Sequence, residues 1–560
     1  MLSLIRSTIT VVLSLSLATA VASTQYSAVT TDGKGAIATV HPIATQAALD
    51  AYKQGGNAID AAVAAAFALG VVDGHNSGIG GGCFALVHWA DGTVQAVDGR
   101  EMAPGKATRE MYVRNGTVDR DLSKTGPLAI GIPGSVATYE YLINQGGKLS
   151  FPAIINPIAD IAGRGFPVDG IYASRLARAA PALKAFEGSK SVLLPGGKPL
   201  QAGDTLIQKD LENTYRHIAK EGAGYFYKGR FASQVGDWMA KHGGIITEED
   251  FANYQLKLRT PVKSEYRGYT VYGFPPPSSG GVHVAQILNI LENFDIAELS
   301  IEERQHLLAE AMKRAFADRA HWLGDPDFVD VPRGLIDQGY ADQLSSQIDA
   351  RKTTLVKTHG TPPKADTDIF GKHTTHIAAA DAEGNWVAIT TTVNTGFGSK
   401  VIVPGTGVIL NNQMDDFSAK PGTPNAYRLV GAEANSIAPG KRPLSSMSPT
   451  IILKDGKPVL TTGAAGGPTI ITQVLQTVVN HLDLKMDVNA SLAAPRIHHQ
   501  WAPDRLFVES ALDSTVKESL KGKGHDLLER GYMGSSQAIS YQGGKFEAAS
   551  EPRLHIRNKP

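Results

Sequence analysis

The chain has 560 residues, of which 42% are hydrophobic and 19% are charged, so a globular protein with ample apolar core is expected. The formal net charge is zero, so electrostatic attraction to nucleic acid or to an anionic membrane is not expected. The single cysteine, Cys83, excludes an intrachain disulfide, a thiolate zinc site and CxxC redox chemistry. Its Gly-rich, apolar surroundings favour a buried structural thiol over a nucleophile.

Residues 1–22 have the pattern of a secretory signal peptide. Arg6 supplies the charge, residues 9–17 form the apolar core, and small residues permit cleavage after Ala20 or Ala22. A short membrane anchor is the alternative, but this core is shorter than the roughly 20 residues that a span needs. We therefore expect a periplasmic or secreted protein with no membrane span once the signal has been removed.

The first part of the chain alternates helical patterns with Gly and Pro. Strands are predicted at residues 35–40 and 94–97. The predicted helices span residues 45–54, 58–69, 135–145, 152–164, 171–180, 209–221, 230–242, 282–293 and 301–323. The glycines at residues 78–82 do not form a dinucleotide fingerprint, because Cys83 occupies its last glycine position and the run follows a helix. Close backbone packing under a sheet explains them better.

Strands dominate the second part of the chain. They are predicted at residues 374–380, 386–394, 407–411, 447–454, 459–463, 505–508 and 537–541, with helices at 469–482 and 514–522. A helix-rich first part and a sheet-rich second part predict a layered α/β domain, with two stacked sheets and helices outside.

The sequence Lys-His-Thr-Thr-His at residues 372–376 follows a segment rich in Gly, Pro, Lys, Asp and Thr. A hydroxyl residue placed between such a segment and a buried hairpin suggests a chain that is cut to expose a nucleophile. If the bond before Thr374 is broken, the new α-amine lies beside its own hydroxyl, and its pKa of about 7.7–8 lets it act as a base. Two threonines before a strand are also explained by ordinary β-propensity.

Six separated motifs resemble the γ-glutamyltranspeptidase family, in the right order. They occupy residues 98–104, 275–281, 372–376, 410–422, 441–450 and 463–468, and the resemblance runs from about residue 35 to the C-terminus. It implies an N-terminal-nucleophile hydrolase with an αββα sandwich of two antiparallel sheets. It also implies self-cleavage between His373 and Thr374. The large subunit 23–373 and the small subunit 374–560 would then form one domain as a heterodimer.

The implied activity is γ-glutamyl transfer and hydrolysis, with glutathione and other γ-glutamyl compounds as donors. Thr374 would attack the γ-amide to form a γ-glutamyl ester, and water or the amine of an amino acid or peptide would take the acyl group. No cofactor and no metal are expected. The alternative is a family member that acts as a cephalosporin (glutaryl) acylase or processes poly-γ-glutamate. A non-enzymatic periplasmic binding protein, which needs no cleavage, is a third possibility.

The resemblance also implies a role for individual residues. Thr392 would tune the nucleophile, and Gly466 and Gly467 would form the oxyanion hole, since two adjacent glycines expose two backbone N–H groups. The donor's α-carboxylate would be held by Arg100, Ser445 and Ser446. Its α-amine would be held by Asn394, Gln413 and Asp416, and Tyr427 would gate the site from a lid at residues 421–432.

Other interpretations of these residues remain open from the sequence alone. A surface ion pair is the commoner interpretation of an arginine such as Arg100. Asp415 with Asp416 could form a turn or a metal site, although no further ligand spacing supports a metal. The sequence departs from the family pattern at Cys83, at Asp73-Gly74-His75 and at Gly396. These departures bear on the pocket edge or on the choice of acceptor.

Overall fold

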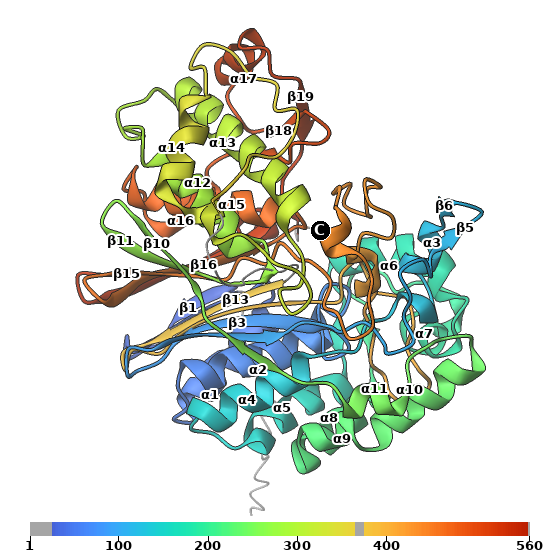
Figure 1. Ribbon diagram of the computed structural model, residues 1–560. Helices are drawn as coiled ribbons and strands as arrows, with labels where there is room; N and C mark the ends of the chain where they lie inside the picture. The colour runs from blue at the N-terminus through green and yellow to red at the C-terminus, as the bar shows by residue number, and fades with distance from the viewer. Residues whose placement is uncertain (1–24, 364–374, 558–560) are drawn as a thin grey trace, which may run out of the picture.

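The structure, a computed structural model, describes residues 25–363 and 375–557. Its centre is a pair of stacked sheets (Figure 1). The seven-stranded sheet has the order β1 (Ser27–Val29), β2 (Gly35–Ala38), β13 (Thr375–Asp381), β14 (Trp386–Thr392), β3 (Gly82–His88), β4 (Val94–Gly99) and β9 (Lys257–Arg259). The six-stranded sheet has the order β10 (Val262–Tyr266), β11 (Tyr269–Gly273), β15 (Thr450–Lys454), β16 (Lys457–Ala465), β20 (Ser535–Gln542) and β21 (Lys545–Ser550).

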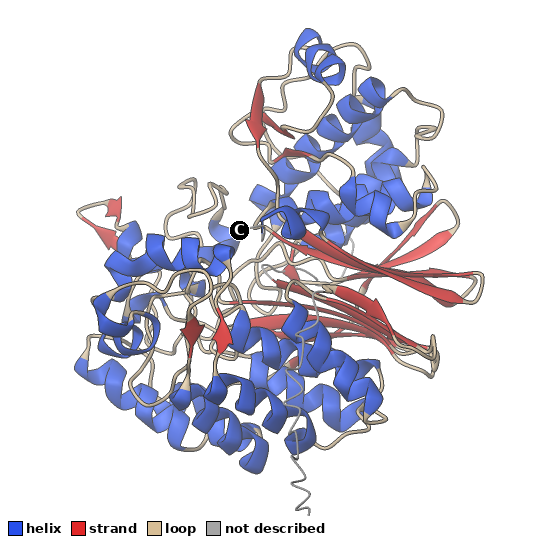
Figure 2. Ribbon diagram, turned by 180° about the vertical axis from the view of Figure 1, so that it is seen from behind, coloured by secondary structure: helices blue, strands red, loops and turns tan. Residues whose placement is uncertain are grey.

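Helices cover the outer face of each sheet, and Figure 2 shows the resulting four layers from behind. The seven-stranded sheet is covered by α1 (Pro42–Lys53), α2 (Ala58–Val72) and α4 (Ser135–Gly146). Helix α5 (Phe151–Arg164) packs on α2, and α8 (Lys209–Glu221) packs on α5. The six-stranded sheet is covered by α12 (Gly280–Leu291), α15 (Thr469–Leu482) and α16 (Val488–Ala493), with α13 (Ile301–Trp322) beyond α12. Every strand pair in the two large sheets is antiparallel. The predicted αββα sandwich is confirmed.

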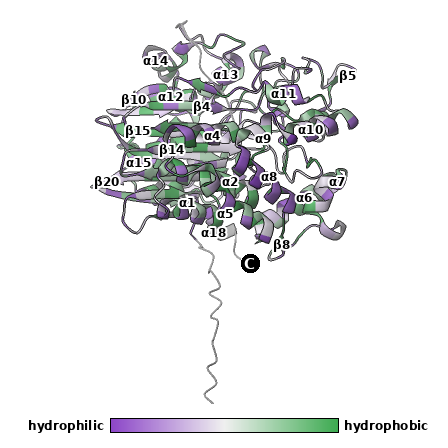
Figure 3. Cartoon of the chain, turned by 90° about the horizontal axis from the view of Figure 1, so that it is seen from below, coloured by the Kyte–Doolittle hydropathy of each residue, from purple (hydrophilic) through white to green (hydrophobic). Residues whose placement is uncertain are grey.

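Side-chain alternation explains why the central strands are buried on both faces. In β13, Ala378 and Ala380 point into the core between the sheets, while Ile377 and Ala379 pack under the helices. Because successive side chains of a strand point to opposite faces, a strand covered on both sides reads as a continuous apolar run. Figure 3 shows the opposite case, with hydrophilic residues on outer helices such as α8 and α10 (Arg230–Lys241).

Most predicted elements are confirmed, with small shifts at their ends. The helices at 209–221, 469–482 and 514–522 begin and end where the sequence places them. Helix α12 begins two residues before its predicted start, and β15 begins three residues after its predicted start. Other elements include α6 (Gly170–Leu183), α11 (Glu248–Ala252), α14 (Gln338–Ser346), α17 (Ser514–Gly522), β17 (Ile497–His499), β18 (Leu506–Glu509) and β19 (Leu527–Arg530).

The predicted strand at residues 407–411 is wrong. The segment makes only one isolated bridge, between Ile402 and Ile409. Gly407 has φ of +67°, and a Cβ there would lie 2.2 Å from the backbone nitrogen of Leu211. The left-handed backbone at Gly407 is incompatible with a regular strand, so tertiary packing overrides the β-branched composition.

The interpretation of the glycine run as a packing feature is supported. A Cβ on Gly80 would lie 2.1 Å from the carbonyl oxygen of Ile409, and one on Gly81 would lie 1.8 Å from that of Thr392. Cys83 has no exposed surface, and burial raises the pKa of its thiol to about 12. A thiol with this pKa is inert at neutral pH, as expected of a structural cysteine.

Candidate active site

The site lies where β13 begins, between the edges of both sheets. His373 and Thr374 lie outside the described residues, and Thr375 is the first residue of β13. Thr375 pairs with Thr391, and Thr392 is the next residue of β14 beyond that pair. The Thr392 hydroxyl accepts a hydrogen bond from the Asn394 backbone N–H at 2.8 Å, which fixes its position. The sheet therefore places Thr392 beside the N-terminal end of β13.

Gly466 and Gly467 lie between the end of β16 and the start of α15. Both have positive φ, +140° and +65°, and a Cβ on Gly467 would lie 2.8 Å from Cδ1 of Tyr427. Side chains are therefore excluded at Gly467 by both conformation and space. The N-terminus of the 14-residue helix α15 starts two residues later, and its dipole favours negative charge at this point.

A buried group of polar side chains, which we call the inner cluster, consists of Arg100, Arg319, Gln413, Asp416, Ser445 and Ser446. Arg100 Nη2 donates to Asp416 Oδ2 at 2.7 Å, and Gln413 Nε2 donates to the same oxygen at 2.8 Å. Arg100 has no exposed surface, so its interpretation as a surface ion pair is wrong. Burial raises the pKa of Asp416, while Arg100 opposes this shift.

Several polar atoms in and beside the inner cluster have no hydrogen-bond partner among the described residues. The acceptors among them are Asp416 Oδ1, Gln413 Oε1 and Asn394 Oδ1, and the groups able to donate are Arg319 Nη2 and the Ser446 hydroxyl. Leaving a buried polar atom without a partner typically costs about 1–3 kcal/mol. Such atoms gathered at one place indicate a site prepared for a polar ligand that carries both donors and acceptors.

Arg319 was not identified from the sequence. It lies inside α13 with 2% of its surface exposed, and its Nε donates to the Ser279 hydroxyl at 3.3 Å. Burial lowers the pKa of its guanidinium to about 9. Its place in an ordinary helical pattern gave no signal, because the approach of α13 to the inner cluster is a property of the packed layers.

The segment at residues 421–432 covers part of the site. The Tyr427 hydroxyl donates to the backbone oxygen of Asn394 at 3.1 Å. The Ala426 N–H donates to Asp415 Oδ2 at 3.0 Å, and the Ser123 hydroxyl donates to Asp415 Oδ1 at 2.5 Å. Asp415 therefore anchors this segment while its neighbour Asp416 faces the inner cluster. Within the described chain, no group of three or more His, Cys, Asp or Glu is placed to hold a metal ion.

A cavity of about 320 Å³, which we call the outer chamber, opens beside Gly466, Gly467 and Tyr427. Its far wall is built from residues that the sequence did not single out as binding residues. They are His41, Asp73, His75, Asn76, Asp169 and Arg175, and the rim includes Thr375, Asn394 and Gly396. Two of the departures from the family pattern, at 73–75 and at Gly396, thus face the same space.

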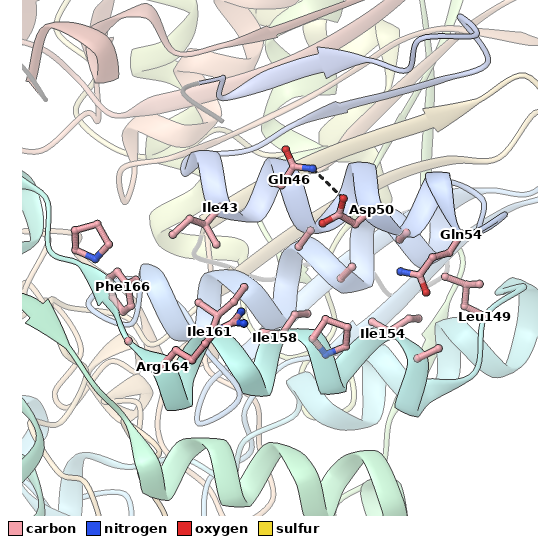
Figure 4. Close-up of a pocket in the computed structure, with 17 residues that line it drawn as sticks. Ile43, Gln46, Asp50, Gln54, Leu149, Ile154, Ile158, Ile161, Arg164 and Phe166 are labelled. Atoms are coloured by element: carbon pink, nitrogen blue, oxygen red, sulfur yellow. Dashed lines mark hydrogen bonds between the residues drawn. The ribbon is translucent and has the colours of Figure 1, made fainter. Parts of the chain in front are cut away.

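A second cavity, of about 460 Å³, lies between α1 and α5 and shares no lining residue with the outer chamber (Figure 4). Ile43, Ile154, Ile158 and Ile161 line it, and Gln46 donates to Asp50 at 2.9 Å along one edge. The lining of this second cavity contains no Ser, Thr or Tyr hydroxyl that could act as a nucleophile.

The chain is similar to several known proteins. The family model described as Gamma-glutamyltranspeptidase matches residues 44–558. The chain is 44% identical over 526 residues to a glutathione hydrolase proenzyme of Escherichia coli (strain K12), with 93% of this chain and 90% of that protein covered. It is 38% identical over 524 residues to an acylase ACY 1 proenzyme of Pseudomonas sp. (strain SE83), covering 91% and 90%.

The solved structure of a cephalosporin acylase from Bacillus halodurans superposes with a TM-score of 0.85 at 29% identity, covering 95% of this chain and 96% of that one. Among the described residues, no helix combines the length and the apolar character needed to cross a membrane.

Proposed function

The chain belongs to the γ-glutamyltranspeptidase family of enzymes, and we propose that it hydrolyses and transfers γ-glutamyl groups through Thr374, with glutathione as a donor. The observation that carries this proposal is the set of buried polar atoms without partners in and beside the inner cluster. Their acceptors suit an α-ammonium group, and Arg100, Arg319 and Ser446 suit an α-carboxylate. A γ-glutamyl group carries both.

The proposed maturation separates the large subunit 23–373 from the small subunit 374–560. The Thr374 hydroxyl attacks the carbonyl carbon of His373, the peptide C–N bond breaks, and water hydrolyses the resulting ester. This frees the α-amine of Thr374 and leaves a carboxylate on His373. The relatives named as proenzymes support a precursor that is processed, and export through the leader at 1–22 would place the heterodimer in the periplasm or outside the cell.

In the catalytic cycle, the α-amine of Thr374 takes the proton of its own hydroxyl as the oxygen attacks the donor's γ-carbonyl. Gly466 and Gly467 are proposed to stabilise the oxyanion with backbone N–H groups, helped by the dipole of α15. The C–N bond of the donor breaks, the leaving amine takes the proton, and a γ-glutamyl ester of Thr374 remains. Water or an acceptor amine then attacks the ester and restores the hydroxyl.

The test is the variant Thr374→Ala, analysed on a denaturing gel and with γ-glutamyl-p-nitroanilide. We expect one uncut chain and no release of p-nitroaniline, because both the attacking hydroxyl and the new amino terminus are lost. Thr375→Val is the matched control, since it alters the neighbouring threonine and should still give two fragments. A fully cleaved Thr374→Ala protein would contradict the proposal.

Acylase activity on a glutaryl cephalosporin is the second candidate, favoured by the fold similarity to a cephalosporin acylase and by the acylase relative. A glutaryl group lacks the α-amine, so it would leave Asp416 Oδ1, Gln413 Oε1 and Asn394 Oδ1 without a donor. Rates on glutathione and on a glutaryl cephalosporin, measured side by side, separate the two activities.

A further inference from the structure

We propose that the outer chamber binds the acceptor, an amino acid or short peptide with a free carboxylate, and that Arg175 holds this carboxylate while Asp73 faces the amine. This inference rests on the proposed function and assigns its second substrate to named residues. The carboxylate end of a leaving cysteinylglycine would occupy the same space, because leaving group and acceptor attach to the same carbonyl carbon.

Among the residues that the structure describes, no carboxylate forms an ion pair with Arg175. The Arg175 side chain projects from α6 into the chamber. Its Nη1 donates to Asn76 Oδ1, which fixes one edge of the guanidinium. The planar fork leaves further N–H groups for bidentate binding of a carboxylate.

Asn76 separates the two charged groups of the chamber. Its Oδ1 accepts from Arg175, and its Nδ2 donates to Asp73 Oδ1 at 2.9 Å and lies 3.1 Å from His75 Nε2. Both ends of the amide are therefore used between Arg175 and Asp73. This arrangement keeps a positive and a negative group apart in one cavity, where direct pairing would neutralise both.

Asp73 lies at the end of the chamber that is formed by Thr375. Its Oδ2 accepts from the Thr375 hydroxyl at 3.5 Å, and Thr375 is bonded to Thr374. Burial raises the pKa of Asp73 to about 7, with Arg175 and Asn76 opposing the shift, so the carboxyl can exchange a proton with an amine near neutral pH. His75, 3.3 Å from Asp73 Oδ1, packs its ring edge-on against Tyr172 with centroids 4.9 Å apart.

The polarity of the chamber thus matches an amino acid in one orientation. The amine lies toward Asp73 and Thr375, and the carboxylate lies toward Arg175. Asp169 also lines the chamber, but its Oδ1 caps α6 by accepting from the Tyr172 N–H at 2.7 Å. The volume of about 320 Å³ falls in the range of small-molecule sites.

The experiment compares two acceptors, glycylglycine and glycylglycinamide, with γ-glutamyl-p-nitroanilide as donor. The acceptors differ in the carboxylate, so their ratio of kcat/KM reports on the group that binds it. The wild-type enzyme should prefer glycylglycine by about tenfold or more, the factor expected for a charged hydrogen-bonded pair. Arg175→Met should bring the ratio close to one, and Arg175→Lys should restore part of it.

Arg178→Met is the matched control. Arg178 lies one turn further along α6, is exposed, and is absent from the chamber wall, so its replacement should leave the acceptor ratio at the wild-type value. An acceptor ratio near one in the wild type, or an unchanged ratio in active Arg175→Met, would overturn the assignment of the chamber. Failure of the wild type to release p-nitroaniline even without acceptor would overturn the proposed function and this inference with it.

Discussion

The inner cluster and the outer chamber both contain opposite charges, but they arrange them differently. In the inner cluster, Arg100 and Asp416 are in direct contact at 2.7 Å, and neither has more than 1% of its surface exposed. In the outer chamber, an amide stands between Arg175 and Asp73, and Arg175 is only partly buried. The buried ion pair of the inner cluster suits a ligand group that is always the same, such as the γ-glutamyl group. The separated charges of the partly open outer chamber suit ligands that differ in length.

The comparison also teaches where selectivity resides. A site that leaves buried acceptors unpaired rejects ligands that lack the matching donor, because each missing hydrogen bond carries a desolvation penalty. An open chamber imposes a smaller penalty, since water replaces a missing contact. On the proposed assignment, the inner cluster is highly selective for the γ-glutamyl donor, whereas the outer chamber is less selective for the acceptor.

The largest effect is expected when the inner ion pair is broken. Asp416→Asn should lower kcat/KM for γ-glutamyl-p-nitroanilide at least about 30-fold, since loss of one partner of a buried charge pair typically costs about 2–5 kcal/mol. The measurement is repeated with glutaryl-p-nitroanilide, which lacks the α-amine. The preference for the γ-glutamyl donor should shrink, and an equal loss on both donors would contradict the role of Asp416 in reading the amine.

A smaller effect is expected at Ser446, whose buried hydroxyl has no partner among the described residues. Ser446→Ala should lower kcat/KM for the γ-glutamyl donor about tenfold, the worth of one hydrogen bond to a charged group, with little change in Tm. Ser448→Ala is the matched control, because the Ser448 hydroxyl donates to the backbone oxygen of Ser446 at 2.9 Å. Its loss should lower Tm more than Ser446→Ala does. A larger loss of Tm in Ser446→Ala than in Ser448→Ala would show that the Ser446 hydroxyl stabilises the fold and does not bind the donor.

The smallest effect concerns stability and Asp73 in the outer chamber. Burial raises the pKa of Asp73 to about 7, whereas an unfolded aspartate titrates near 3.9. Between these values the folded state binds more protons, so the free energy of unfolding falls as pH rises from about 4 to about 7. Asp73→Asn removes this penalty, and its Tm relative to the wild type should rise across that window by about a few degrees at most.

An aspartate of opposite character provides the control for this pH series. Hydrogen bonds from the Thr93 N–H and hydroxyl to exposed Asp91 lower the pKa of that carboxyl. Its stabilising contribution is present above the unfolded pKa and is lost as pH falls. Asp91→Asn should therefore lose Tm relative to the wild type as pH rises, and the same sign in both variants would contradict the assignment for Asp73.

The sequence by itself determined the layered architecture, most elements and the residues of the inner cluster that stand in motifs. Strand-like runs such as 374–380 and 386–394 predict a buried hairpin, and the family motifs contain Arg100, Gln413, Asp416, Ser445 and Ser446. These signals are local, because periodicity and motif spacing are written along the chain.

Only the tertiary structure decided which further residues join the site and what each motif residue touches. Arg319 reaches the inner cluster because α13 packs beyond α12, and Arg175 contacts Asn76, which lies 99 residues earlier in the chain. Tertiary packing likewise turned the expected strand at 407–411 into an isolated bridge. Contacts between distant segments form only when the layers pack against one another. The same packing buries these polar groups, and burial determines their protonation and their hydrogen-bond partners.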